Sequence, residues 1–197
     1  MKIMIVGATG TIGKAVANLL ERDHDIVRVG YRDGDYQVDL GSKQSIEGLF
    51  DAVGPVDAVI STAGQAGFAP FAELDDDAFD LALGNKLMGQ VNLVRIGADR
   101  LAEGGSVTLT SGILARQPMP GSAAVSMANG ALDAFVGAAA MEVGRGIRVN
   151  AVAPAFVKET MVMMGMDPAP GVSAADTAMA YKLAVEGDAN GEVLDVA

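Results

Sequence analysis

Three glycines near the start of the chain could bind a diphosphate. Gly7, Gly10 and Gly13 follow a short apolar run at 3–6 and precede apolar residues that recur with a helical period. Between a strand and a helix, such glycines allow a tight turn, a close approach of the backbone to a pyrophosphate, and close helix–strand packing. The phosphates would bind free N–H groups at the helix N-terminus. The pattern predicts dinucleotide binding; the alternative is a glycine-rich turn that binds nothing.

The rest of the composition limits the chemistry. The chain has no Cys and one His, which excludes a thiol nucleophile and argues against a histidine metal site or a Ser–His triad, so no metal site is predicted. His24, between two aspartates, is expected to be a solvated turn residue. The net charge of -11 argues against nucleic-acid binding, which requires a basic surface. It does not argue against a nucleotide held by backbone amides.

Strands and helices alternate around the glycines. After a helix that starts near Ile12, the patterns predict strands at 26–30, 36–40, 56–60, 106–110, 147–152 and 192–196. They predict helices at 42–53, within 74–102, at 122–143 and at 174–186, with loops at 65–72 and 156–173 and an irregular Met-rich piece at 161–166. This order predicts one α/β domain over residues 1–197, a three-layer, doubly wound, Rossmann-like parallel sheet of about seven strands.

The N-terminal apolar run is too short for the core of a signal peptide or for a membrane span. We therefore expect a cytoplasmic protein that does not bind membranes. The helix at 122–143 is rich in Ala, Gly and Ser, which suits close helix–helix contact across a two-fold axis, so a homodimer or homotetramer is expected.

Four segments, in this order, resemble the short-chain dehydrogenase/reductase family over nearly the whole chain. They are Gly7-Ala-Thr-Gly-Thr-Ile-Gly13, Ser61-Thr-Ala-Gly64, the stretch Gly84-Asn-Lys-Leu-Met-Gly89 with Asn85, and Arg148-Val-Asn-Ala-Val-Ala-Pro-Ala155. The resemblance implies an oxidoreductase that transfers hydride between NAD(P) and a small carbonyl or alcohol. It also implies dimers or tetramers built on the long helix.

The resemblance implies a set of cofactor-binding residues at the ends of several strands. They are Gly7, Thr9, Gly10, Thr11, Ile12, Gly13, Arg32, Asp39, Leu40, Ala63, Gly64, Asn129, Pro154 and Val157. Arg32 can pair with a 2′-phosphate, which favours NADP over NAD; alternatively it is a solvated partner of Asp33 or Asp35. Asp39 and Leu40 resemble the family's adenine-reading pair, although Asp39 could equally cap the next helix.

The family's proton donor is missing. The resemblance implies a Tyr-x-x-x-Lys pair in the long helix, but Val125 stands at the tyrosine position and Asn129 at the lysine position. Ser111 is the best match for the serine that polarises the substrate carbonyl, or else it ends a strand and caps a turn. Asn85 resembles the asparagine of the family's proton relay, and the neighbouring Lys86 is expected to be a surface residue.

Two functions follow. The first is an NADP(H)-dependent oxidoreductase with a non-standard or impaired site, because loss of a positioned general acid costs about 10²–10⁴-fold in rate. The second is a non-catalytic NADP(H) sensor or scaffold. The methionines at 161–166 could form the apolar wall of a lid or could fill a core or an interface.

Overall fold

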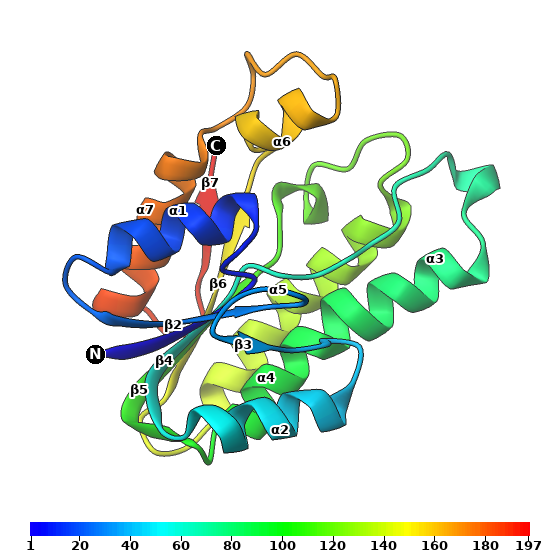
Figure 1. Cartoon of the computed structure of the whole chain (residues 1–197). Coiled ribbons are helices and arrows are strands. Elements are labelled where there is room, and N and C mark those ends of the chain that lie inside the picture. The colour runs from blue at the N-terminus through cyan, green and yellow to red at the C-terminus, as the bar shows by residue number, and fades with distance from the viewer.

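The computed structural model describes residues 1–197 and has one parallel sheet with helices on both faces (Figure 1). The strand order is β3-β2-β1-β4-β5-β6-β7, and every neighbouring pair is parallel. The strands are β1 (Lys2–Val6), β2 (Asp25–Gly30), β3 (Tyr36–Gln37), β4 (Val56–Ser61), β5 (Leu101–Thr110), β6 (Arg148–Pro154) and β7 (Val193–Val196). This is the doubly wound, Rossmann-like sheet that the alternation predicts.

Each face of the sheet is covered by its own set of helices. On one face lie α1 (Thr11–Leu20) and α7 (Ala174–Glu186), and on the other lie α2 (Lys43–Val53), α4 (Gly89–Gly97) and α5 (Ala123–Glu142). The remaining helices are α3 (Asp76–Leu81), α6 (Lys158–Met163), the 3-10 turns η1 (Phe71–Glu73) and η3 (Ile113–Ala115), and η2 (Ala82–Met88), which is a π-helix. Two large apolar clusters fill the spaces between helices and sheet.

The central position of β1 determines where a ligand can bind. Ile3, Met4 and Ile5 are fully buried because helices cover this strand on both sides. The strand order reverses at β1, since β2 pairs on one side and β4 on the other. In open parallel sheets, the crevice for a ligand lies at the carboxyl ends of the strands at such a reversal.

Three predicted elements differ from the structure. The strand predicted at 36–40 ends at Gln37, because the Asp39 carboxylate accepts a hydrogen bond from the Gly41 N–H (2.9 Å) and closes a turn. The strand predicted at 106–110 starts earlier, at Leu101, and contains an irregular register opposite Val56–Ala58. The piece predicted to be irregular at 161–166 instead includes part of α6, which is held by the buried Met161.

Judged by length and composition alone, the helix α5 is apolar enough to cross a membrane. Its Leu132 and Val136 are fully buried and belong to the core cluster shared with the sheet. The helix therefore has the role of a layer helix in this fold, as the pattern at 122–143 predicts.

Candidate functional site

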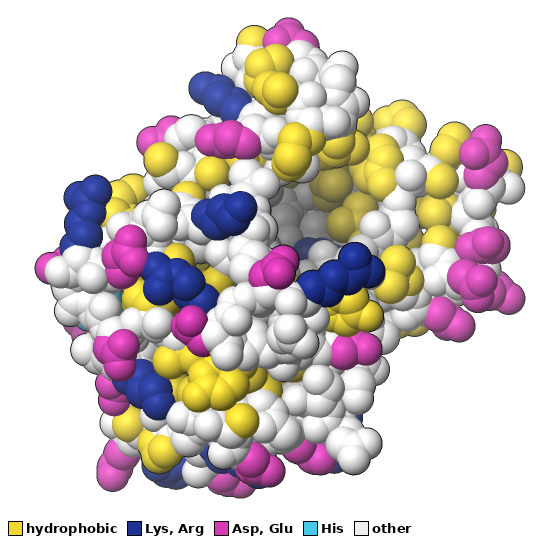
Figure 2. Space-filling view, viewed as in Figure 1, with side chains coloured by type: hydrophobic (Ala, Val, Ile, Leu, Met, Phe, Trp, Pro, Cys, Tyr) yellow, Lys and Arg dark blue, Asp and Glu magenta, His cyan; other side chains and the backbone are white.

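A cleft of about 560 Å³ opens at the carboxyl ends of β1, β2 and β4. The space-filling view shows a hollow between the segment that carries α6 and the segment that carries α3 (Figure 2). Six residues predicted to bind the cofactor or to act in the proton relay line the cleft. They are Gly7, Asp39, Leu40, Ala63, Gly64 and Asn85.

The turn between β1 and α1 is shaped by its glycines. Gly7 has φ +88°, and a Cβ there would lie 2.8 Å from Thr62 Oγ1. A Cβ on Gly13 would lie 2.0 Å from the Gly7 carbonyl oxygen, so no side chain fits. The N-cap of α1 is Gly10, and no side chain caps the helix. Uncapped N–H groups at a helix N-terminus beside a cleft suit a diphosphate, so this turn fits a dinucleotide.

Asp39 lines the cleft, and Arg32 lies with Asp39 in an adjoining hollow of the surface. Arg32 is exposed, and its guanidinium carbon lies 5.8 Å from the centre of the Tyr31 ring. No ion pair joins it to Asp33 or Asp35, which leaves the side chain available to a phosphate. Asp39 does not cap α2; the cap is Ser42, whose hydroxyl accepts from the Ser45 N–H (3.2 Å).

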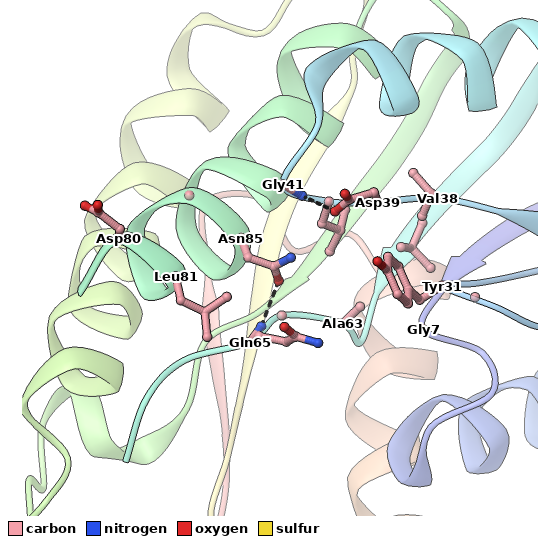
Figure 3. Close-up of a pocket in the computed structure, with 15 residues that line it drawn as sticks. Gly7, Tyr31, Val38, Asp39, Gly41, Ala63, Gln65, Asp80, Leu81 and Asn85 are labelled. Carbon is pink, nitrogen blue, oxygen red and sulfur yellow. Dashed lines mark hydrogen bonds between the residues drawn. The ribbon is translucent and has the colours of Figure 1, made fainter. Parts of the chain in front are cut away.

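Asn85 fixes the loop that follows β4. Its side-chain Oδ1 accepts a hydrogen bond from the Gln65 N–H (2.9 Å), as Figure 3 shows. Asn85 lies within the π-helix η2, whose i→i+5 hydrogen bonds make a wider turn than an α-helix. The asparagine that the sequence singled out therefore lies within the π-helical turns, on the wall of the cleft.

The predicted substrate end lies beyond this cleft, at the ends of β5 and β6. Ser111 directly follows β5, and Asn129 approaches it from α5: a Cβ on Gly112 would lie 2.8 Å from Asn129 Nδ2. Val125 is half-buried one helical turn before Asn129 and offers no proton. Pro154 ends β6, and the buried Val157 is the N-cap of α6. None of these residues lines the cleft.

Lys86 is not a surface residue, which corrects the prediction. It is 8% exposed, and its Nζ lies 3.4 Å from the carbonyl oxygens of both Thr110 and Ser111. Burial lowers the pKa of its ammonium group to about 8, and the negative charge of Asp133 partly opposes this shift. Little in the sequence indicates this burial. Lys86 follows Asn85, but a helical period of 3.6 residues does not describe the π-helix that contains both residues.

Tyr31 lines the cleft beside the end of β2, whereas Tyr181 does not reach it. Tyr181 on α7 is fully buried, and its hydroxyl lies 2.5 Å from Thr110 Oγ1. Burial raises the pKa of this phenol far above its usual value. It belongs to the apolar cluster beneath α1 and α7, where it has no access to a ligand in the cleft.

Comparisons with known proteins agree with this fold. A family model described as enoyl-(acyl carrier protein) reductase matches residues 6–189. The crystal structure of lin1944 from Listeria innocua is 39% identical, with a TM-score of 0.95 and full coverage of both chains. A small-chain dehydrogenase solved in complex with NADPH is 28% identical, with a TM-score of 0.87, covering 100% of this chain and 96% of that one.

A curated relative, carbonyl reductase [NADPH] 2 from Sus scrofa, is 33% identical over 63% of this chain and 52% of its own length. The chain spans about half the length of most of the curated relatives that it matches.

Proposed function

Because the chain belongs to the short-chain dehydrogenase/reductase family, we propose that it is an NADP(H)-dependent oxidoreductase acting on a small carbonyl or alcohol. The observation that carries this proposal is the turn between Gly7 and Gly13 at the end of β1, where neither of these two glycines has room for a side chain and Gly7 lines the cleft. When bound, the nicotinamide would donate or accept the hydride. The protein's own residues have to hold the nucleotide, orient the substrate and move a proton.

The assignment of the nucleotide follows the cleft from one end to the other. The N–H groups of Gly10 to Gly13 would hold the diphosphate. Arg32 would pair with the 2′-phosphate of NADP, and Asp39 with Leu40 would contact the adenine. Ala63 and Gly64, with Asn129, would lie along the ribose of the nicotinamide, and Pro154 and Val157 would contact its ring.

NADP is supported by two independent comparisons as well as by Arg32. The NADPH complex of the small-chain dehydrogenase has the same fold over the whole of this chain. The porcine relative is named as an NADPH-dependent carbonyl reductase. An acidic residue at position 32 would instead have favoured the free ribose hydroxyls of NAD.

The test has two steps. Titration with NADPH, followed by its fluorescence, should saturate, and binding of NADH should be weaker. A panel of small aldehydes and ketones should then consume NADPH, followed by its absorbance, and Ser111→Ala should reduce this activity. Saturable NADPH binding without consumption by any carbonyl would favour the second function, a cofactor sensor or scaffold. No binding at millimolar NADPH would contradict both.

We also propose that the protein assembles as a homodimer or homotetramer through α5. This helix carries exposed methionines, with Met127 41% and Met141 87% exposed, among small residues that permit close contact. Sedimentation equilibrium should give a mass at least twice that of one chain; a monomer would contradict this proposal. The cytoplasmic location stays a prediction.

A further inference from the structure

Three buried polar side chains from different elements surround the carboxyl end of β5. Lys86 comes from η2, Ser111 directly follows β5, and Asn129 comes from α5. Ser111 is 4% exposed and Asn129 is 2% exposed, yet Ser111 Oγ and Asn129 Oδ1 have no hydrogen-bond partner. Buried polar atoms are nearly always paired, so these two unpaired atoms are available to bind a ligand.

The cluster lies directly behind the wall of the cleft. Gly64 lines the cleft, and a Cβ on Gly64 would lie 2.9 Å from Lys86 Cγ. The lysine side chain therefore passes beneath Gly64 and ends at the Ser111 carbonyl, 3.4 Å from Nζ. The Asn129 amide lies next to Gly112, since a Cβ on Gly112 would lie 2.8 Å from Asn129 Nδ2.

A purely structural role for Lys86 is poorly supported, because Gln90 already holds the end of β5. The Gln90 Nε2 donates to the Thr110 carbonyl (2.9 Å), and its Oε1 accepts from the Thr110 N–H (2.8 Å). The two carbonyl contacts of Lys86 are longer, at 3.4 Å each. Burial of an ammonium group with so few hydrogen bonds costs free energy of folding. Buried charges of this kind are typical of functional sites.

The charges around Lys86 favour proton exchange near neutral pH. Burial lowers its pKa to about 8, and Asp133 on α5, itself paired with Arg116, is the charged group that opposes the shift. The other charged side chains of the packed helices are exposed to solvent. They are Asp75, Asp76, Asp77 and Asp80 at α3, Arg95 on α4 and Glu142 on α5.

We propose that Lys86 is the proton source for carbonyl reduction, in place of the family's Tyr–Lys pair. Its Nζ contacts the Ser111 carbonyl, and the unpaired Ser111 hydroxyl would turn toward Nζ to relay the proton. This inference rests on the proposed function. When the carbonyl carbon accepts hydride from the reduced nicotinamide, the electron pair of its C=O π bond moves to oxygen. The Ser111 O–H bond breaks as the new O–H bond of the alcohol forms. A Lys86 N–H bond breaks as the Ser111 hydroxyl is restored, and solvent reprotonates the neutral amine.

The first measurement uses the wild-type protein without cofactor. Brief acetylation at a series of pH values, followed by mass spectrometry of each lysine, reports the fraction of free amine. Lys86 should react with a midpoint near pH 8, well below the ordinary pKa of a lysine side chain. Addition of NADPH should slow acetylation of Lys86. A midpoint for Lys86 at the ordinary lysine pKa would overturn the proposal.

The second measurement compares Lys86→Met, Lys86→Arg and the surface control Lys43→Met. Arginine keeps the positive charge but does not release its proton, so both changes at Lys86 should lower kcat/KM for NADPH-dependent reduction about 100-fold or more. In the wild type, kcat/KM should fall above about pH 8, and this decline should be absent in both variants. The Kd for NADPH should change less than about threefold, and Lys43→Met should behave as the wild type.

The two possible failures are distinct. If the wild type reduces a carbonyl and Lys86→Met retains both the rate and the decline above pH 8, the role of Lys86 is wrong while the proposed reduction stands. If the wild type binds NADPH but reduces no carbonyl, the proposed function is wrong and this role with it.

Discussion

The two ends of the site are built from different parts of the chain. At the proposed nucleotide end, the glycines and free backbone N–H groups of one continuous segment, 7–13, would form the binding surface. At the proposed proton-transfer end, side chains from η2 and α5 approach the chain directly after β5. A backbone site depends on local conformation and tolerates few residue types. In a site made of side chains, a residue on a different helix or strand can take over the role of one that has been replaced. The replacement of one residue type therefore does not by itself abolish the chemistry.

The largest effect should come from closing the nucleotide end. In Gly13→Ala, the new Cβ would lie 2.0 Å from the Gly7 carbonyl oxygen, so the turn has to move. We expect the free energy of unfolding to fall by about 3 kcal/mol and NADPH affinity to fall roughly 100-fold. Urea unfolding and fluorescence titration measure the two effects.

The matched control is Gly48→Ala on α2, where nothing lies within 4 Å of the new Cβ. Removal of glycine from the interior of a helix should stabilise the fold by about 0.5–1 kcal/mol and leave NADPH affinity unchanged. Equal behaviour of the two variants would show that the turn is not shaped by its glycines.

The next effect concerns stability at the proton-transfer end. Burial lowers the pKa of Lys86 from 10.5 to about 8, so the unfolded chain binds the proton more tightly than the folded protein does. The resulting penalty is complete below pH 8 and decreases as the pH rises from 8 to 10.5. Relative to Lys86→Met, the wild type should therefore gain roughly 2–3 kcal/mol of stability between pH 7 and pH 10. Urea unfolding at both pH values measures it, and a constant difference would contradict the burial of the charge.

A smaller effect should distinguish the two nucleotides. Arg32→Ala removes an exposed guanidinium beside the adenosine side, so the Kd for NADPH should rise roughly 10-fold while that for NADH hardly changes. Arg95→Ala, at an exposed position on α4, is the control. Equal losses for both nucleotides would mean that Arg32 does not contact the 2′-phosphate.

The smallest effect should come from Asp133. Its negative charge raises the pKa of Lys86 against the effect of burial, so Asp133→Asn should move the acetylation midpoint of Lys86 to lower pH. Asp77→Asn, on the exposed side of α3, should leave the midpoint unchanged. A shift to higher pH in Asp133→Asn would contradict the assigned charge interaction.

Local patterns predicted those parts of the fold that depend on local chemistry. The run at 3–6, the glycine turn and the helix at 174–186 agree with β1, the start of α1 and α7. The early start of β5 could not be predicted, because residues 101–105 join the sheet through pairing with a distant strand. Likewise, α6 is anchored through Val157 pairing with Val172, a contact that no local period reveals.

The site was predicted to a different extent at its two ends. The conformation of segment 7–13 could be predicted because the spacing of its glycines specifies a tight turn between a strand and a helix. The position of Lys86 could not, because helical periodicity assumes 3.6 residues per turn and η2 is wider. The Tyr-x-x-x-Lys spacing identifies Val125 and Asn129 as the residues at the positions of the family's pair. It gives no information about a lysine on a neighbouring helix.

The wide turn of η2 also makes this part of the chain sensitive to its length. One residue fewer between Asp80 and Gly89 would allow an ordinary α-helix to form, in which each residue turns by about 100°. The ammonium group would then rotate away from β5 although every remaining residue type was kept. In this stretch, a single deleted codon would matter more than most exchanges of one amino acid for another, and amine acetylation of such a deletion variant would detect the rotation as a newly exposed lysine.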